Sequence, residues 1–309
     1  MELLAKGMPL AFAIWVFTLG AVIGSFLNVV IARVPKGESV VSPGSRCPRC
    51  KRAIRWYDNV PILSWLILRG KCRDCALPIS PRYPMVELLI ALLAVAIARQ
   101  LGPTWVALGY FAFATSLVAL AYIDLDTWLL PSQITWPLLA LGLLSPLWNH
   151  GLPWRESLIG GAIGYALFAA IALFGEKVLK REVMGWGDVW LLAGIGAWLG
   201  WQALLPVVLL SAMQGALVGV VLLALGKTPD GKGNDAPPRP QETSPQEASQ
   251  PLVEHAADVP VVVPTDDDWV PPKNAVPYGP FLALAALEYL LAGARIVSSW
   301  YGLLQRLLG

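Results

Sequence analysis

The sequence predicts an all-α polytopic membrane protein with about eight transmembrane helices and a small cytoplasmic zinc-binding loop domain. Composition is the first reason. Of 309 residues, 56% are hydrophobic and only 14% are charged, whereas soluble domains are about 45–50% apolar and about 25% charged. The second reason is the recurrence of apolar runs long enough to cross a bilayer. The third is that all four cysteines lie in one hydrophilic segment, as two C-x-x-C pairs.

Eight apolar runs are expected to span the membrane. For the first run a cleaved signal peptide is the alternative, but Arg33 and Lys36 follow the run instead of preceding it, and no A-x-A cleavage site appears. A transmembrane helix is therefore expected there. The eight expected spans cover residues 8–32, 83–101, 104–124, 128–148, 157–175, 188–201, 203–226 and 279–297.

Lysine and arginine concentrate in every second connection between these spans. Eleven lie in 33–82, three in 175–187 and four in 227–276, together 18 of the 23 in the chain. Because positive charge marks the cytoplasmic side of a membrane protein, these three connections are expected in the cytoplasm and both termini outside it. The same topology places Asp124 and Asp188 together at the cytoplasmic face.

The chain is expected to divide into five parts. The fourth holds ten Pro and nine Asp or Glu, a composition that cannot bury a core and predicts disorder. The five parts are a first transmembrane helix at 1–32, a four-cysteine loop at 33–82, a six-helix membrane core at 83–226, the Pro-rich acidic loop at 227–276, and a last transmembrane helix with the C-terminal tail at 277–309.

The cysteines form the pattern C-x2-C-x21-C-x2-C, with members Cys47, Cys50, Cys72 and Cys75. Two such pairs at this distance are typical of a tetrahedral zinc site. Four thiolates leave no open position for a water molecule, so the zinc would be structural and would fold the loop. Two disulfides or a redox pair are the alternative, but a reducing cytosol argues against disulfides.

Two carboxylates are the candidate catalytic groups. Asp188 follows Gly185 and Gly187 at the head of an apolar helix, and Asp124 closes an earlier apolar run. An ionised Asp in a membrane is costly unless it faces protein or water, so a functional role is the default hypothesis. The glycines allow unusual backbone angles and leave room for a substrate backbone. Two carboxylates from two helices are the parts of an aspartyl protease, since one activates water while the other holds a proton.

Asp126 competes with Asp124 for this role. It lies two residues further on and so on a different helical face. We expect it to be an interfacial charge or a cap for a helix that begins near Trp128. The chain has only two histidines, and both lie in predicted loops, which excludes an H-E-x-x-H zinc protease and a Ser–His intramembrane protease.

Six motifs together resemble the type IV prepilin peptidases, in that family's order, from about residue 10 to residue 290 apart from 227–276. They are Gly24–Asn28, the four-cysteine loop, Tyr83–Glu87, Ile123–Asp124 with Leu129–Pro131, Met184–Asp188 and Pro277–Phe281. The chain departs from the family at Ser132, where Asp is common, and at Trp186, which is bulkier than the usual residue. The loop 227–276 is also not usual for the family.

The resemblance implies a bacterial inner-membrane enzyme of pilus and type II secretion systems. The implied enzyme removes the basic leader of prepilins or pseudopilins after a Gly, with Asp124 and Asp188 as catalytic residues. It also implies N-methylation of the new amino terminus with S-adenosylmethionine, for which Asn28 and Glu87 are candidates as a substrate or methyl-transfer region. No nucleic-acid partner is expected. The alternatives are a peptidase without methyl transfer and a proton-coupled transporter, because intramembrane carboxylates also relay protons.

Overall fold

The computed structural model describes residues 8–47, 49–180, 184–225 and 276–308, with side chains up to residue 293. In this part of the chain the secondary structure is helical, apart from two isolated β-bridges in the cysteine loop. The chain separates into a main unit, Met1–Ala216 with Pro277–Gly309, and a second unit, Leu217–Val276. The prediction of disorder at 227–276 falls, except for Val276, outside the described residues.

In the described residues, eight helices of 13 residues or more lie in the eight predicted spans, which confirms the all-α polytopic class. They are α2 (Leu10–Arg33), α4 (Arg82–Leu101), α5 (Trp105–Thr127), α6 (Ser132–Leu144), α7 (Trp154–Phe174), α8 (Trp186–Leu199), α9 (Leu204–Ala224) and α10 (Gly279–Leu308), and a short helix α3 (Leu63–Ile67) lies in the cysteine loop.

Among the described residues, five helical segments are long and apolar enough to cross a membrane, namely those that contain α2, α4, α5, α7 and α9. Two further helices are shortened for local reasons. Pro137 lies inside α6, and α8 is confined between Gly185 and Gly200, whose φ is 80°. In α10 the part with described side chains, Gly279–Gly293, is apolar.

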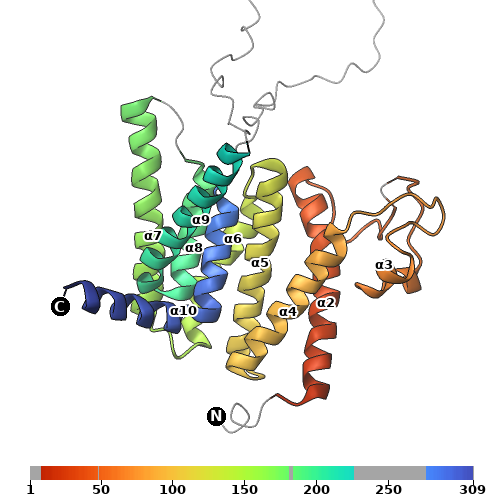
Figure 1. Ribbon diagram of the computed structural model, residues 1–309, viewed down its shortest axis with the longest axis horizontal. Coiled ribbons are helices and arrows are strands. Elements are labelled where there is room, and N and C mark those ends of the chain that lie inside the picture. The colour runs from red at the N-terminus through yellow and green to blue at the C-terminus, as the bar shows by residue number, and fades with distance from the viewer. Residues whose placement is uncertain (1–7, 48, 181–183, 226–275, 309) are drawn as a thin grey trace, which may run out of the picture. The chain divides into compact units, whose positions relative to one another are not determined.

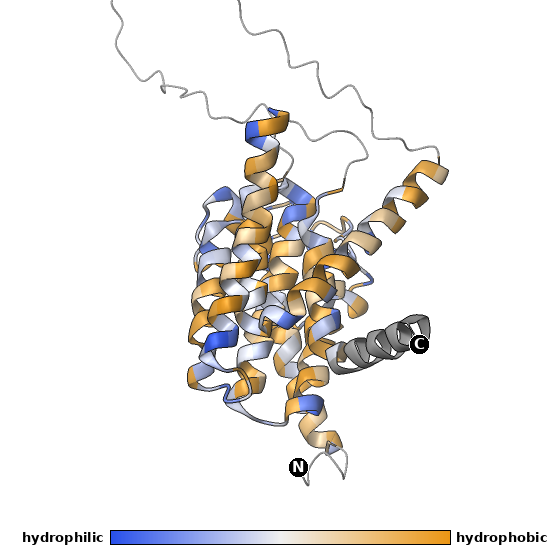
Figure 2. Cartoon of the chain, turned by 90° about the vertical axis from the view of Figure 1, so that its left-hand side faces the viewer, coloured by the Kyte–Doolittle hydropathy of each residue, from blue (hydrophilic) through white to orange (hydrophobic). Residues whose placement is uncertain are grey.

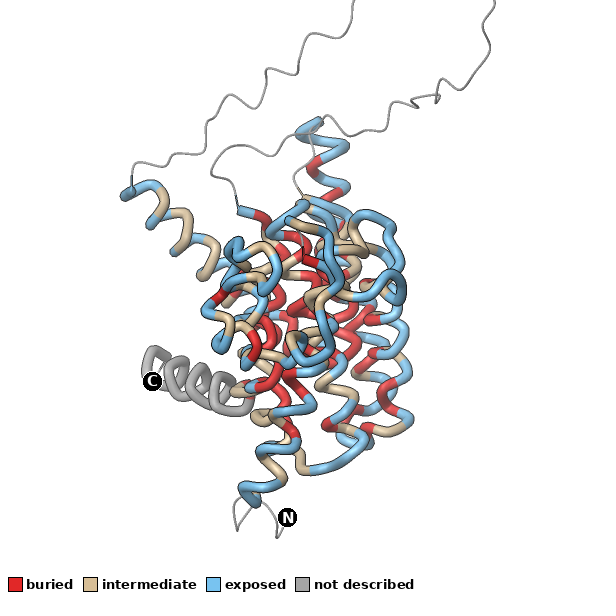
Figure 3. Tube along the Cα trace, turned by 90° about the vertical axis from the view of Figure 1, so that its right-hand side faces the viewer, coloured by how far each residue is buried: buried red, intermediate tan, exposed pale blue. Residues whose placement is uncertain are grey.

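The helices of the main unit pack side by side in an order that differs from their order in the chain (Figure 1). Helix α2 packs on α4, α4 on α5, α5 on α10, α10 on α8, and α8 on both α6 and α7. Their buried faces meet in one hydrophobic core, to which α5 contributes most. Figure 3 shows the buried residues in red. Outer faces are rich in exposed Leu, Ile, Val and Trp (Figure 2), as expected of a surface that meets lipid.

Glycines set the closest helix contacts, as is common in membranes where small residues let backbones approach. A Cβ on Gly24 of α2 would lie 2.7 Å from the Cα of Glu87 on α4. In the α7–α8 pair, a Cβ on Gly160 would overlap the backbone oxygen of Gly196, and a Cβ on Gly196 would overlap that of Gly160. Helix α8 can therefore lie deep in the core.

Two details at the end of α5 differ from the expectation, while the interpretation of Asp126 as an interfacial charge stays open. The predicted span ends at Asp124, but α5 continues to Thr127, so Asp124 lies within the helix. Asp126 does not cap a helix that begins near Trp128, because Trp128 takes a left-handed conformation with φ 57° and α6 begins only at Ser132, after Pro131. Asp126 instead lies in the last turn of α5.

Candidate active site and cysteine cluster

The two candidate carboxylates come from helices that reach the same end of the main unit. Asp124 lies one turn before the end of α5 and is only 5% exposed. Asp188 is the third residue of α8, and its backbone N–H donates to the oxygen of Gly185, the residue that caps this helix. Amide dipoles at a helix amino terminus favour a negative charge there.

Gly279, the first residue of α10, lies between the two carboxyl groups. A Cβ at this position would lie 3.5 Å from Asp188 Oδ1 and would overlap Asp124 Oδ2. The two aspartates are near enough for their charges to interact. The structure thus brings Asp124 and Asp188 together, 64 positions apart in the chain. Sequence reasoning quoted Pro277–Phe281 as a motif but assigned Gly279 no position in the site.

One atom of this pair has no partner. Asp188 Oδ1 is buried and accepts no hydrogen bond from the described residues. A buried polar atom without a partner costs about 1–3 kcal/mol, and such atoms persist at sites that a proton or a substrate group completes. Two close carboxyl groups repel each other when both are ionised, so this arrangement is suited to hold one shared proton.

The start of α10 is held by a hydrogen bond next to the carboxyl pair. The hydroxyl groups of Tyr278 and Ser211 lie 2.6 Å apart, which ties this turn to α9. Since Tyr278 precedes Gly279, the bond fixes the glycine that separates the two carboxyl groups. The sequence offered no signal for this pair, whose members are 67 positions apart.

The three residues before Asp188 each make a different contact. A Cβ on Gly187 would lie 2.7 Å from Leu130 Cβ, so this glycine lets α8 begin against the Leu129–Pro131 segment. A Cβ on Gly185 would lie 3.7 Å from Asp188 Oδ2, an ordinary contact distance. The bulky Trp186 is exposed, and its indole nitrogen donates to Glu176 Oε1 at 3.0 Å, in the π-helical segment Gly175–Leu179 that follows α7.

Asp126 is engaged elsewhere. Its carboxylate pairs with Arg82 at 2.7 Å, and Arg82 also donates to the Tyr122 oxygen and lies 4.7 Å from the centre of the Tyr122 ring. Arg82 begins α4, so these contacts join the amino end of α4 to the carboxyl end of α5. Among the described residues, Arg82 forms its ion pair with Asp126 and none with Glu87.

The four cysteine sulfurs lie within 4.8 Å of one another, and those of Cys47 and Cys75 are 3.9 Å apart. Sulfurs bound at about 2.3 Å to one tetrahedral zinc ion would be about 3.8 Å apart. No disulfide joins these cysteines. The cluster can therefore hold a metal ion, as the spacing predicts.

Both C-x-x-C pairs have the same backbone geometry. The N–H of Cys47 donates to the Arg52 oxygen, and the N–H of Cys72 donates to the Leu77 oxygen, each at 2.9 Å. The residue after each pair, Lys51 or Ala76, turns back to the first cysteine with a positive φ. Two identical turns thus present two sulfurs each to one point.

The loop holds its shape by polar contacts as well. Arg73, between Cys72 and Cys75, donates two hydrogen bonds to Asp58, at 2.8 and 2.6 Å. These bonds from Arg73 lower the pKa of the Asp58 carboxyl below its ordinary value. Asp58 is therefore ionised and already paired.

Asn28 and Glu87 meet where α2, α4 and the cysteine loop come together. Asn28 Nδ2 donates to the Tyr83 oxygen at 3.1 Å. Glu87 is 8% exposed, and its Oε2 accepts the Ile62 N–H at 2.6 Å. Asn28 and Glu87 thus form a second polar centre, whose hydrogen bonds involve neither Asp124 nor Asp188.

Two family models match the chain. Residues 18–101 match the bacterial peptidase A24 N-terminal domain, and residues 111–220 match the type IV leader peptidase family. The first match includes α2, the cysteine loop and α4. The second contains both Asp124 and Asp188.

The chain is also similar to three relatives that carry the same name, prepilin leader peptidase/N-methyltransferase. The relative from Myxococcus xanthus is 44% identical, with 91% of this chain and 90% of the relative covered. The relative from Aeromonas hydrophila is 43% identical over 72% and 85%, and that from Stutzerimonas stutzeri is 34% identical over 97% and 96%. No solved structure matches.

Proposed function

This chain belongs to the type IV leader peptidase family, and on that premise we propose that it is a membrane aspartyl endopeptidase that processes prepilins or pseudopilins. It removes their basic leader after a Gly and N-methylates the new amino terminus. The observation that carries the proposal is the meeting of the buried Asp124 carboxyl group and the partly buried Asp188 carboxyl group at Gly279.

We assign the hydrolysis to Asp124 and Asp188. The ionised member of the pair takes a proton from a water molecule, while the protonated member hydrogen-bonds the scissile carbonyl oxygen. The proton then passes to the leaving amine. Because one proton is shared, the pair acts as a unit and the roles of base and acid are not divided between fixed residues.

The proposed substrate enters from the lipid, with its apolar helix in the membrane and its basic leader in the cytoplasm. The carboxyl pair, the start of α4 and the cysteine loop lie at one end of the main unit. The excess of Lys and Arg in the connections at that end supports its assignment to the cytoplasmic face of the bacterial inner membrane. The cut then falls where leader meets helix.

We propose that the metal is zinc and that its role is structural. Four thiolate ligands fill a tetrahedral shell, so no position is left for a water molecule or a substrate group. The loop between α2 and α4 is too small for a core of its own, and the bound metal would supply its folding energy. The methyl donor would be S-adenosylmethionine, with Asn28 and Glu87 as candidates for the methyl-transfer region.

One assay tests both activities. Purified full-length protein in detergent is incubated with a prepilin peptide and methyl-labelled S-adenosylmethionine, and leader release and methyl incorporation are measured separately. We expect both products, with label only on the cleaved chain. Cleavage without label would leave a peptidase alone, and absence of cleavage would contradict the proposal.

A further inference from the structure

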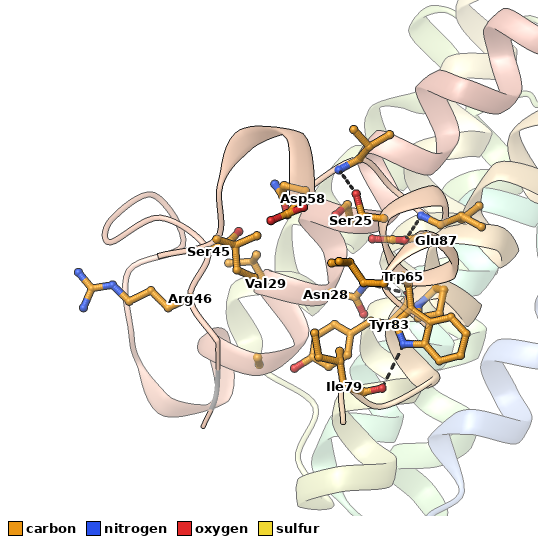
Figure 4. Close-up of a pocket in the computed structure, with 18 of the residues that line it drawn as sticks. Ser25, Asn28, Val29, Ser45, Arg46, Asp58, Trp65, Ile79, Tyr83 and Glu87 are labelled. Carbon is orange, nitrogen blue, oxygen red and sulfur yellow. Dashed lines mark hydrogen bonds between the residues drawn. The ribbon is translucent and has the colours of Figure 1, made fainter. Parts of the chain in front are cut away.

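A partly open cavity of about 220 Å³ lies between α2, α4 and the cysteine loop. Its lining includes Ser25 and Asn28 of α2, Asp58 and Trp65 of the loop, and Tyr83 and Glu87 of α4 (Figure 4). The cavity has polar, aromatic and acidic groups together, which is the composition of a ligand site rather than of a packing defect. It is separate from the carboxyl pair, neither member of which lines it.

Glu87 of α4 is the acidic residue of the lining that has no positively charged partner. Its oxygen accepts the Ile62 N–H, but no ion pair among the described residues includes it. The other acid of the lining, Asp58, is already paired with Arg73. A buried carboxylate without a cation is costly, so a positively charged ligand in this cavity would be stabilised by Glu87.

The lining also holds three basic residues, Arg33, Arg46 and Lys71, and none of them forms an ion pair with Glu87. The guanidinium of Arg33 donates to the oxygens of Ser39 and Gly44. Arg46 is turned away from the other labelled residues (Figure 4). Glu87 is therefore left to pair with a cationic ligand.

Aromatic rings and amide groups line the same cavity as Glu87. Trp65 is held in place because its indole nitrogen donates to the Ile79 oxygen at 3.1 Å, and Gly70 lies against its ring. Tyr83 supplies a second aromatic ring, and the amides of Asn28 and Asn59 supply donors and acceptors. An aromatic base would match the two rings, a sugar with hydroxyl groups would match the amides, and a cationic centre would match Glu87.

A second cavity connects this region with the end of α5. It is lined by Asn28, Ile31, Ala32, Ser80, Arg82, Tyr83 and Asp126. Three of these residues, Asn28, Ala32 and Tyr83, also line the first cavity. The second cavity reaches Asp126 at the end of α5, the helix that carries Asp124 on another face.

We propose that the first cavity binds the methyl donor, an adenosyl sulfonium, and that Glu87 pairs with its positive charge. This inference rests on the proposed function, because the donor matters only if the chain methylates its product. The neutral amine of the cleaved chain attacks the methyl carbon, the carbon–sulfur bond breaks with its electron pair left on sulfur, and the nitrogen gives its extra proton to solvent. Atoms and charge balance, with a neutral thioether as second product.

The test compares two ligands that differ in this charge. Equilibrium binding of S-adenosylmethionine and of S-adenosylhomocysteine, which lacks the sulfonium charge, is measured on full-length wild type, Glu87→Gln and Glu38→Gln. We expect Glu87→Gln to weaken binding of the sulfonium ligand by roughly tenfold or more. Binding of S-adenosylhomocysteine should stay within about threefold, which also reports that the variant is folded. Glu38, an exposed acid of the same loop outside the lining, is the matched control and should change neither.

The position of the ligand is read out independently. Ultraviolet cross-linking of labelled S-adenosylmethionine to wild type should label peptides within 25–33 or 58–87, and label in α7–α10 would overturn the inference. If Glu87→Gln lost affinity equally for both ligands, or for neither, the inference would also be overturned. Methylation by wild type would in that case still uphold the proposed function. A wild type that neither binds the donor nor methylates would overturn the methyl-transfer half of the proposed function as well.

Discussion

Three glycines lie near the carboxyl pair, and a side chain would meet different surroundings at each of them. Gly279 leaves the space in which the carboxyl groups of Asp124 and Asp188 meet. Gly187 lets α8 start against Leu130. At Gly185 the backbone angles are those of any residue, with φ −69°, and a methyl group would make an ordinary contact. We therefore expect the three glycines to differ in how well they tolerate substitution by alanine.

At Gly279 we predict that alanine lowers leader cleavage by roughly 10- to 100-fold, because its methyl group would force the two carboxyl groups out of their geometry. Cleavage of a prepilin peptide measures the effect. Gly215→Ala is the control, since its Cβ would lie 3.6 Å from Phe281, at ordinary contact distance. Cleavage by Gly279→Ala at the wild-type rate would contradict the position we give to this residue.

At the head of α8 we predict that Gly187→Ala reduces both stability and cleavage, whereas Gly185→Ala changes them less. The added methyl group at 187 meets Leu130 at 2.7 Å, and such overpacking costs about 1–3 kcal/mol. Thermal melting and cleavage of the two variants are compared side by side. A greater loss in Gly185→Ala would show that Gly185 has a role that its contacts do not reveal.

Among the elements, the α7–α8 pair depends on backbone contact. A Cβ on Gly160 would meet the backbone of Gly196, and neither backbone can turn away as a flexible side chain could. On the neighbouring Gly161, the nearest atom to a Cβ would be Leu143 Cδ2 at 3.5 Å. Adjacent glycines therefore differ in what they contribute to the position of α8, the helix that carries Asp188.

We predict that Gly160→Ala lowers the melting temperature and Gly161→Ala does not. The expected loss for Gly160→Ala is about 1–3 kcal/mol, typical of an overpacked core. Melting of the purified protein in detergent measures both variants under the same conditions. Equal melting temperatures would mean that α7 and α8 are farther apart than we describe.

The cysteine loop is the element that depends on a metal. We predict one zinc ion per chain, and its loss in the Cys72→Ser, Cys75→Ser variant, because two of four ligands are removed. Metal analysis of the purified protein measures this. Cleavage should fall less than in the aspartate variants, since a closed site supports folding and not chemistry. Zinc retained at one per chain in this variant would rule out the site.

At the scale of the whole molecule, the sequence was sufficient for the fold class and the family. Apolar runs predict the eight helices, because length and hydropathy are local properties. The motifs predict the family resemblance, and the relatives confirm it. The spacing of Cys47, Cys50, Cys72 and Cys75 predicts their cluster because metal-ligand spacing is local too.

The rest depends on contacts between distant segments, which no local pattern contains. Gly279 reaches the carboxyl pair across more than 90 positions, and Arg82 pairs with Asp126 across 44. The acceptor of the Ile62 N–H is Glu87, 25 positions away. The predicted end of α5 was too early because a single residue sets where this helix stops. That residue is Trp128, whose left-handed conformation does not follow from its residue type.

These long-range contacts bring the two polar centres to one end of the main unit. Helix α4 carries Glu87 and, through Arg82, contacts the end of α5 that carries Asp124. Cleavage and methylation of one amino terminus require such closeness, because the amine released at one site must reach the other. The arrangement fits a single enzyme that performs both steps.

The central claim is that Asp124 and Asp188 form one catalytic pair, and leader cleavage by aspartate-to-asparagine variants tests it most directly. An amide can neither take nor hold the shared proton, so Asp124→Asn and Asp188→Asn should each lose roughly 100-fold or more of the cleavage rate. Asp126→Asn is the matched control two residues away. Its pair with Arg82 is partly exposed, with side chains 42% and 36% accessible, and such pairs contribute little, so it should keep most of the activity. An active Asp124→Asn together with an inactive Asp126→Asn would contradict the account.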